Sequence, residues 1–521
     1  MSKRERLLLA ATAAITLLLR ALAYFRYRFD SDEQQHLHVS WSWTAGLLPY
    51  RDTFDNHAPL FHWITAPLLA MCGERADILL WMRLPMLVLF GVIVWGTYVL
   101  GKRLHDERVA MWAAMLLALF PPFFLKSLEF RTDNLWTALW VVALVVLTGG
   151  ALNARRMFVV GLLLGCAFAT SLKTTLLLIT LGAAALITFF FILRRRATIP
   201  AIQWFLAGFV IVPAAFALYF AAHGAWDDLL YCAFTFNGNL AKTRDNLWIG
   251  RAIFPFTSAA LLYVAWRFRQ HAHPWRYFFA MCIGVYTVVL AGFWILISPR
   301  DFLALMPLLA IFAAAFTTRA RNPLAAFAAI VVLMLGSLWH YADRFENNTD
   351  WHTTMMDQAL RLSHPGEVLM DLKGETIYRR RPFFYAFENI TRAQIAHGIL
   401  ADTVAEDVVQ QRAYVAQADG PMWPPRARAF LSANFLNMGR LRAAGQWLKD
   451  DGSFSIAIPG EYVIVGAEGE LRGTLDGTPY NGARQLPAGA HRFENGKGAA
   501  VMWAPAFRRG HSPFHPRDLD F

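Results

Sequence analysis

The chain has 521 residues, of which 56% are hydrophobic and only 17% are charged. This composition is too apolar for an ordinary soluble protein. The net charge is +12 at pH 7. No stripe of alternating basic and aromatic residues accompanies this charge, so we expect no nucleic-acid partner.

The apolar residues form runs of about 16–23 residues, the length that a helix needs to cross about 30 Å of hydrocarbon. A shorter apolar run at 60–71 is typical of an interfacial or re-entrant helix. The pattern predicts a polytopic α-helical membrane protein with about 11 transmembrane helices. We expect them near 7–25, 78–100, 109–125, 134–150, 157–172, 174–193, 203–222, 252–268, 277–298, 302–318 and 324–340.

Basic residues gather in alternate connections between these runs, and the positive-inside rule makes that side cytoplasmic. The N-terminus then lies in the cytoplasm, and an odd number of spans leaves the C-terminal part on the periplasmic or extracytoplasmic side. The expected location is a bacterial inner (plasma) membrane. The basic clusters are Lys3–Arg6, Lys102–Arg103 with Arg108, Arg155–Arg156, Arg194–Arg196, Arg267–Arg276, and Arg319 with Arg321.

After Trp339 the composition changes to that of a folded soluble region. We therefore divide the chain into a membrane domain (1–340), an extracytoplasmic α/β region (341–450), and a β-rich region with the tail (451–521). No catalytic constellation stands out after residue 340, so we expect a supporting or substrate-gripping role there. The sequence favours strands at 368–371, 376–378, 462–465 and 499–503, and helices within 404–417 and 427–448.

Two adjacent acids, Asp32 and Glu33, follow the first apolar run, with Asp30 just before them. Carboxylates buried beside hydrocarbon cost several kcal/mol unless they are paired, so such residues usually have a partner or a function. Other ionisable residues fall in outer connections that are far apart in sequence. They are the acids Asp52, Asp55, Glu129 and Asp133, the cations Arg51, Lys126, Arg131, Lys173, Lys242, Arg244 and Arg300, and the histidines His36, His38 and His57.

A carboxylate base among cations suits the displacement of an anionic lipid phosphate by a hydroxyl or an amine. The carboxylate takes the proton of the acceptor, and the cations offset the charge that develops on the departing phosphate. The alternative is ordinary solvated charge, or snorkelling of Lys173 and Arg300 at the ends of spans. Because outer-side cations are disfavoured by the positive-inside rule, we favour the functional interpretation.

The stretch from Asp32-Glu33 through Gly46 and Pro49-Tyr50-Arg51-Asp52 to His57-Ala58-Pro59-Leu60 resembles the first outer loop of the GT-C superfamily. These are polyprenyl-phosphate-sugar-dependent glycosyltransferases, and they include the protein O-mannosyltransferase and lipid A aminoarabinose transferase families. One departure is Ala58-Pro59, where the family usually has Pro-Pro. Further matches, which extend the resemblance over about 1–340, are Glu129-Phe130-Arg131-Thr132-Asp133, Gly161 to Gly165 leading to Lys173, and Pro299-Arg300-Asp301-Phe302 leading to Pro307.

The resemblance implies transfer of a sugar from a polyprenyl-phosphate-linked donor to a lipid, glycan or protein acceptor on the extracytoplasmic side, with inversion at the sugar carbon. It makes Asp32 the general base, and Glu33 a residue that orients it, binds the acceptor or helps to hold a metal. Asp133 becomes the second acid of the site. The substrate-binding candidates that it implies are Lys173, Arg300, Arg131, His57 and Tyr50.

Two questions stay open at this point. No cofactor is certain, and a divalent metal, with Asp32 and Glu33 as its candidate ligands, is neither required nor excluded. The alternative function is a multi-pass transporter or flippase with an outer accessory domain. That alternative predicts ionisable residues near the middle of the membrane and an internal repeat, and we find no convincing repeat.

Overall fold

The computed structural model describes residues 1–193, 200–243, 247–269, 273–294, 297–417, 420, 422–494 and 496–516. Arg194–Arg196 and Arg244 lie outside the described residues. The chain divides into two compact units, and each is described in turn. The first consists of Met1–Phe29, Asn56–Ile64 and Leu80–Thr349, and the second of Asp30–Asp55, Thr65–Leu79 and Asp350–Phe521.

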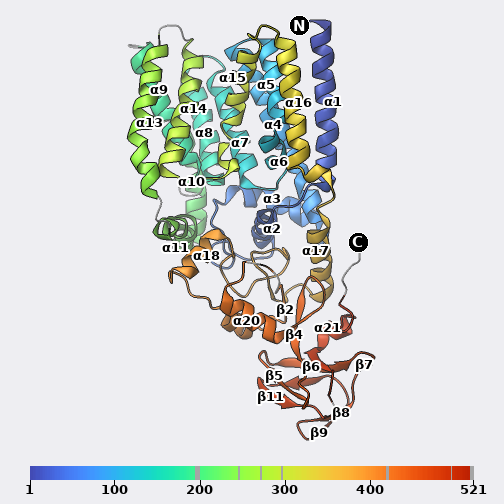
Figure 1. Cartoon of the computed structure of the whole chain (residues 1–521). Helices are drawn as coiled ribbons and strands as arrows, with labels where there is room; N and C mark the ends of the chain where they lie inside the picture. Colours follow the sequence, from blue (N-terminus) through green and yellow to red (C-terminus); the bar gives the residue numbers. More distant parts are fainter. Residues whose placement is uncertain are drawn as a thin grey trace. The chain divides into compact units, whose positions relative to one another are not determined.

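The first unit is a bundle of helices that run alternately toward and away from the end that carries the N-terminus (Figure 1). Each of the eleven predicted ranges overlaps a helix. The main helices are α1 (Lys3–Arg26), α4 (Ile78–Leu104), α5 (Glu107–Leu119), α6 (Pro121–Lys126), α7 (Thr132–Leu147), α8 (Ala154–Thr170), α9 (Thr174–Thr188), α10 (Pro200–Ala222), α13 (Leu247–Phe268), α14 (Pro274–Phe293), α15 (Met306–Thr317) and α16 (Pro323–Tyr341).

Short helices complete this unit. They are α11 (Trp226–Leu230) and α12 (Phe236–Asn239), while α3 (Leu60–Cys72) begins in the first unit and ends in the second. The predicted interfacial segment 60–71 thus forms a helix of 13 residues, a length that spans only about two thirds of the hydrocarbon thickness at 1.5 Å per residue.

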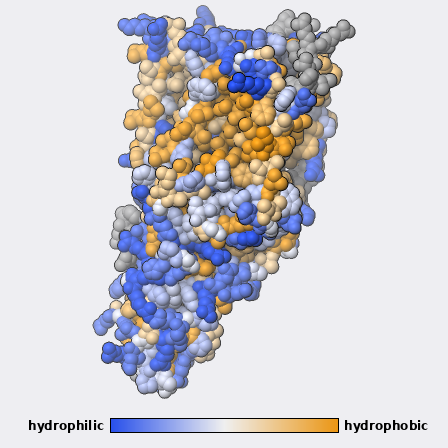
Figure 2. Space-filling model, turned by 180° about the vertical axis from the view of Figure 1, so that it is seen from behind, coloured by the Kyte–Doolittle hydropathy of each residue, from blue (hydrophilic) through white to orange (hydrophobic). Residues whose placement is uncertain are grey.

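The surface of the helical unit carries a broad band of apolar side chains (Figure 2). Leu17 and Leu18 of α1, Val88 of α4 and Phe316 of α15 are among the large apolar residues that are more than 60% exposed. An apolar surface of this extent is stable against lipid and unstable in water. Within the described residues, six helices are long and apolar enough to cross a membrane. The chain is a multi-pass membrane protein, and the count of eleven spans stays a prediction.

Small residues bring α8 and α10 into close contact. A Cβ atom at Gly161 would lie 2.0 Å from the carbonyl oxygen of Phe205, and one at Gly208 would lie 2.1 Å from that of Phe158. Both distances are far below van der Waals contact. The glycines therefore let the two helix backbones approach, as small residues do in membrane bundles.

We expect Gly161→Val to separate α8 from α10 and to reduce the yield of folded protein strongly. The physical reason is that backbone atoms, which cannot rotate away as a side chain can, occupy the space of the new Cβ. Size-exclusion profiles and thermal unfolding of detergent-purified protein measure the effect. Gly182→Val in α9 is the matched control, because nothing lies within 4 Å of a Cβ there. Equal yields for the two variants would contradict this role of Gly161.

The second unit contains a mixed sheet with helices beside it (Figure 1). Its helices are α2 (Ser31–Thr44), α17 (Asp350–Leu362), α18 (Asn389–Ala396), α19 (Val404–Gln410), α20 (Pro425–Asn434) and α21 (Ala504–Arg508). The sheet has the order β1-β2-β4-β12-β6-β10, in which only β1 and β2 are parallel. Its strands are β1 (Leu369–Met370), β2 (Val415–Ala416), β4 (Arg442–Trp447), β6 (Gly460–Gly466), β10 (Arg484–Leu486) and β12 (Ala500–Trp503), with β3 (Phe435–Asn437) on β4 and β7 (Gly469–Glu470) on β6.

Two antiparallel pairs, β5 (Ser453–Ile456) with β11 (Gly489–Arg492) and β8 (Gly473–Leu475) with β9 (Thr478–Tyr480), lie outside this sheet. The sheet takes strands from both predicted regions, since β1, β2 and β4 precede residue 451 and β6, β10 and β12 follow it. The division into 341–450 and 451–521 stays a prediction.

Three of the expected strands are confirmed as β1, β6 and β12, but two other local predictions are wrong. Residues 376–378 form an irregular loop in which Ile377 has a φ of 47°. The helix expected within 427–448 ends at Asn434, and β3 and β4 follow. Gly445 contributes to the second difference, since its φ of 156° is not helical and is rarely adopted by other residues, and a Cβ there would lie 2.2 Å from the carbonyl oxygen of Val501 on β12.

Candidate active site

A network of buried ion pairs lies in the first unit, at the starts of α7 and α9 and in the connections that precede α7 and α15. Lys173 Nζ is 2.8 Å from Asp133 Oδ1 and 2.6 Å from Asp301 Oδ1. Arg131 Nε is 3.3 Å from the second oxygen of Asp133. The three carboxylates of the whole network, those of Glu129, Asp133 and Asp301, are at most 4% exposed, and the cations are at most 19% exposed.

The second part of this network is centred on Glu129. Lys126 Nζ is 2.7 Å from its Oε1, and Arg300 Nη2 is 2.9 Å from its Oε2. Together the seven side chains comprise four cations and three carboxylates, so one positive charge is in excess when all are ionised. Such a cluster is suited to an additional anion, because the charge is already desolvated and its geometry is fixed.

The sequence explains why these residues meet. Asp133 lies in the first turn of α7, where the positive end of the helix dipole favours an acid. Lys173 directly precedes α9. Asp301 belongs to a short 3-10 turn at Pro299–Phe302, and it accepts hydrogen bonds from the backbone N–H (2.6 Å) and the hydroxyl (3.0 Å) of Ser298.

Further polar groups hold the connection between α6 and α7. The Asn134 side-chain amide donates to the carbonyl oxygens of Glu129 (2.7 Å) and Lys126 (3.2 Å). Arg20 of α1 is buried, donates to the Ser127 carbonyl oxygen at 2.9 Å, and has its guanidinium carbon 4.3 Å from the ring centre of Phe90. Arg20 therefore holds the chain beside Glu129 in place.

His57 belongs to the first unit but lies in a different setting from the network. Its ring faces that of His62, with the ring centres 6.3 Å apart. The ring centres of Phe61 and Phe130 lie 4.8 Å apart. Phe130 stands between Glu129 and Arg131 in the sequence, so this contact attaches the start of α3 to the connection between α6 and α7. The role of His57 in substrate binding stays a prediction.

Asp32 and Glu33 lie at the start of α2 in the second unit, where they have different partners. Glu33 is fully buried and completes a capping box with Asp30, since its Oε1 accepts the Asp30 N–H at 2.9 Å. Asp32 forms an ion pair with Lys373, which is 8% exposed. The adjacent acids thus divide into one that caps the helix and one that faces a cation from the C-terminal part of the chain.

Asp371 builds the loop that presents Lys373. It is completely buried, and its carboxylate accepts hydrogen bonds from the backbone N–H of Gly374 (2.7 Å) and of Thr376 (2.8 Å). Arg381 Nε donates to the same carboxylate at 2.8 Å and ties the far end of the loop to its start. Burial lowers the pKa of Arg381, whereas the carboxylate of Asp371 beside it acts in the opposite direction.

The same loop docks on α2. The Gln34 side-chain amide donates to the Glu375 carbonyl oxygen at 3.3 Å, and His38 Nδ1 lies 2.8 Å from the Ile377 carbonyl oxygen. Because the carbonyl can only accept, His38 Nδ1 carries the proton. Burial lowers the pKa of His38. Ile377 keeps a positive φ, which costs about 1–3 kcal/mol and persists only where the surroundings enforce it.

Tyr50 forms a tight turn in the second unit. It has a φ of 72°, is 1% exposed, and its N–H donates to the Thr53 carbonyl oxygen at 2.8 Å. Asp52 accepts the Leu48 N–H at 2.8 Å and pairs with Arg51 at 3.0 Å. The hydrogen bond from Arg51 is the largest cause of a lowered pKa of Asp52. The turn is thus held in one conformation by its own hydrogen bonds and ion pair. Substrate binding by Tyr50 stays a prediction.

The candidate metal ligands do not gather into a recognisable metal centre. In the part of the chain that the structure describes, no three His, Cys, Asp or Glu side chains lie close enough together to hold a metal ion. One oxygen of Glu33 is used by the capping box, and Asp32 is paired with Lys373. The metal role of Asp32 and Glu33 stays a prediction.

Sequence reasoning brought together Asp133, Lys173, Arg131 and Arg300, and it noted Glu129, Lys126 and Asp301 only as members of larger sets. It missed Lys373 and its loop entirely. The available signal was an acid directly after a predicted strand, followed by Lys373-Gly374 and a run of three arginines from Arg379. That pattern marks a turn rich in hydrogen-bonding groups but does not reveal its partner helix.

Glu375 gives this loop a pH-dependent stability. Burial and the nearby Asp371 carboxylate raise the pKa of Glu375 to about 7, from an ordinary value of 4.5. Between these values the folded chain holds a proton that the unfolded chain has lost. Stability therefore falls as the pH rises through this window, by up to about 1.4 kcal/mol per pH unit.

We expect Glu375→Gln to remove this slope, so that thermal unfolding temperatures measured at pH 5, 6, 7 and 8 change less than in the wild type. The exposed Glu468→Gln is the control, and it should keep the wild-type slope. A slope in Glu375→Gln as steep as that of the wild type would show that another group is responsible.

Comparison with known proteins gives one match to a family model. Residues 56–221 match the family model described as dolichyl-phosphate-mannose-protein mannosyltransferase. The matched range contains Glu129, Arg131, Asp133 and Lys173 of the network, and His57. No curated protein is similar enough in sequence to this chain to count as a relative.

Solved structures extend the likeness to most of the chain. The crystal structure of ArnT from Cupriavidus metallidurans in the apo state has 15% sequence identity and a TM-score of 0.56, with 84% of this chain and 97% of that chain covered. The chain shares the fold of that protein. ArnT of the same organism bound to undecaprenyl phosphate gives 13% identity, coverage of 83% and 97%, and a TM-score of 0.48. The Archaeoglobus fulgidus oligosaccharyltransferase in complex with Zn and sulfate has 12% sequence identity and a TM-score of 0.47, with 92% of this chain and 74% of that chain covered.

Proposed function

We propose that the chain is an integral-membrane glycosyltransferase of the GT-C type. It transfers a sugar from a polyprenyl-phosphate-linked donor to a lipid, glycan or protein acceptor on the extracytoplasmic side of a bacterial inner membrane. The observation that carries the proposal is the buried network of Lys126, Arg131, Lys173 and Arg300 with three carboxylates, inside a helical unit of this fold.

The donor class is supported by charge and by the family match. The network has one positive charge in excess, and it lies at an end of an apolar bundle where a lipid-borne phosphate can arrive from the bilayer. We infer that Lys173 and Arg300 contact that phosphate and that Arg131 assists them. The family model that matches residues 56–221 is named for a dolichyl-phosphate-linked sugar donor, which is a polyprenyl-type carrier.

The proposed general base is Asp32. Its partner Lys373 favours the ionised carboxylate, which is the form that accepts a proton from the acceptor hydroxyl or amine. The carboxylate attracts the acceptor proton as the new bond to the sugar carbon forms on the side opposite the leaving phosphate. Inversion at that carbon follows from such a single displacement. Glu33, whose carboxylate caps α2, positions the first turn that carries Asp32.

The test is transfer by the purified full-length protein from a panel of polyprenyl-phosphate sugars, with and without a chelator. We expect one or more donors to release polyprenyl phosphate only when an acceptor extract is present. If the release of polyprenyl phosphate requires a divalent ion, the enzyme uses a metal cofactor. A protein that moves the intact donor across vesicles, and never cleaves it, would instead support the transporter or flippase.

A further inference from the structure

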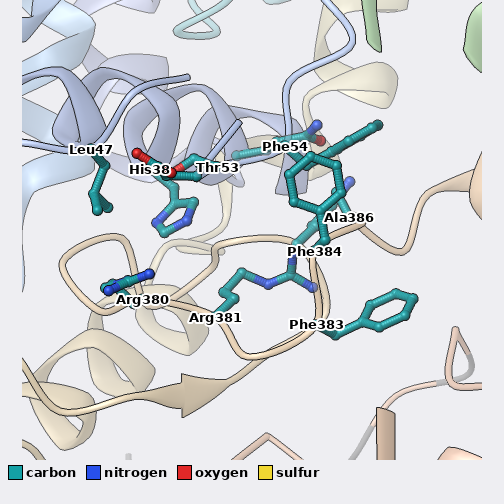
Figure 3. A pocket seen from close by; sticks show the side chains of 12 residues that line it. His38, Leu47, Thr53, Phe54, Arg380, Arg381, Phe383, Phe384 and Ala386 are labelled. Carbon is teal, nitrogen blue, oxygen red and sulfur yellow. The ribbon is translucent and has the colours of Figure 1, made fainter. Parts of the chain in front are cut away.

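An open hollow lies in the second unit, between α2 and the turn at Tyr50 on one side and the loop after β1 on the other (Figure 3). Its lining residues include His38, Asp52, Phe54, Lys373, Arg380 and Phe384.

Basic side chains predominate in the lining of the hollow. Lys373, Arg380 and Arg381 line it, and Asp52 is the only lining acid among the described residues. Lys373 and Arg381 are each paired with a carboxylate of the second unit. Arg380 is exposed, and among the described residues its guanidinium forms no ion pair or hydrogen bond, although its charge helps to lower the pKa of Asp52. It therefore supplies a cation that an incoming anion can use.

A second, independent observation concerns Gln35, which also lines the hollow. The residue is 2% exposed, and neither its side-chain oxygen nor its nitrogen has a hydrogen-bond partner among the described residues. A buried amide without partners destabilises the fold, because both of its polar atoms have lost their hydrogen bonds to water. A ligand with hydroxyl groups, each able both to donate and to accept, would satisfy both ends of this amide.

Aromatic side chains form the remaining wall. The rings of Phe54 and Phe384 lie edge to face, with their centres 5.5 Å apart, and Phe384 is partly exposed (Figure 3). An apolar face beside polar groups is the environment that a sugar ring needs, since the ring has an apolar face and a hydroxyl-bearing edge. A hydroxyl-rich ring with one negative charge fits all three walls.

We propose that this hollow binds an anionic saccharide, with its phosphate or carboxylate on Arg380, its hydroxyls on Gln35 and its ring against Phe384. The bound saccharide is the head of the acceptor, an assignment that rests on the proposed function. Lys373 connects the site to the proposed chemistry, because it both lines the hollow and pairs with Asp32. The acceptor class is thus an acidic glycan or glycolipid.

The experiment measures binding without turnover, so that its outcome does not depend on the donor or on transfer. Full-length protein in nanodiscs is titrated with glucuronate, glucose 6-phosphate, glucose and inorganic phosphate, and binding is followed by calorimetry or saturation-transfer NMR. We expect the two anionic sugars to bind at least about tenfold more tightly than glucose or inorganic phosphate, since one hydrogen bond to a charged group is worth about 1.5–3 kcal/mol.

Arg380→Gln should weaken binding of both anionic sugars about tenfold and leave that of glucose unchanged. Arg472→Gln is the matched control, because Arg472 is exposed and far along the chain from the hollow. Gln35→Leu should weaken all sugars while leaving inorganic phosphate unchanged. Glucose binding as tightly as the anionic sugars, or Arg380→Gln binding like the wild type, overturns the proposal. Inorganic phosphate binding as tightly as glucose 6-phosphate overturns its saccharide part.

These outcomes separate the two proposals. If the protein binds the probes in the expected order but transfers no sugar from any donor, the proposed saccharide site stands and the proposed glycosyltransferase activity is wrong. If the protein transfers sugar but binds none of the four probes, the proposed enzyme activity stands and the proposed saccharide site is wrong.

Discussion

Asp32→Asn is expected to reduce sugar transfer by about 10²–10⁴-fold in kcat/KM, the contribution of a positioned general base. The amide retains the size of the carboxylate and can still contact its neighbours, but it cannot take up the acceptor proton. Transfer from a polyprenyl-phosphate sugar, measured with purified protein of normal thermal stability, checks the expectation. The control is Asp357→Asn on α17, an exposed acid paired with Arg361 at 2.7 Å.

Lys373→Met separates the loss of a base from the loss of an ion pair. It breaks the same pair with Asp32 but leaves the carboxylate in place. We expect a smaller loss than for Asp32→Asn, with a pH profile shifted upward, because the carboxylate no longer has a cation that favours its ionised form. Equal losses in the two variants, with unchanged pH profiles, would show that the ion pair acts only by holding the loop. Full activity of Asp32→Asn would remove Asp32 from the mechanism.

Much of the helical unit could be predicted from the sequence, because long apolar runs and their basic flanks report directly on membrane crossing. The network could be predicted in part for the same reason. The predicted topology places the connections that carry Asp133, Lys173 and Arg300 on one side of the membrane. Because the ends of the bundled helices lie close together there, these residues were expected to be near one another. The sequence could not show that Asp301 and Glu129 neutralise Lys173 and Arg300, since that depends on side-chain directions at four separate helix ends.

The second unit was harder to predict, because its long-range contacts follow no local period. The apolar pattern after Phe435 fits a helix as well as a strand, and the pairing of β4 with β12 decides between them. Asp371 holds its loop through hydrogen bonds within the loop itself, which no sequence pattern reveals. The partner of Lys373, Asp32, lies 341 residues earlier in the chain. Nothing in the composition of either segment specifies that pairing.

Lys173→Met is expected to destabilise the protein by about 3–5 kcal/mol, the usual cost of removing one partner from a buried ion pair. Lys173 lies between Asp133 and Asp301, whose side chains are only 4% and 2% exposed. Without the ammonium, Asp301 loses its ion-pair partner in a poorly hydrated place, while Asp133 keeps only the longer pair with Arg131. Denaturant-induced or thermal unfolding in detergent measures the loss, and donor binding should disappear with it.

Two further variants distinguish stability from substrate binding at Lys173. Lys102→Met removes an exposed cation, 3.4 Å from Glu107, and should leave the free energy of unfolding nearly unchanged. Lys173→Arg keeps the charge between Asp133 and Asp301, so it should retain most of the stability. If Lys173→Arg is stable but binds the donor poorly, the compact ammonium is needed for the lipid phosphate. If it is stable and fully active, Lys173 serves the network through its charge alone, and Arg300 becomes the principal contact of the phosphate.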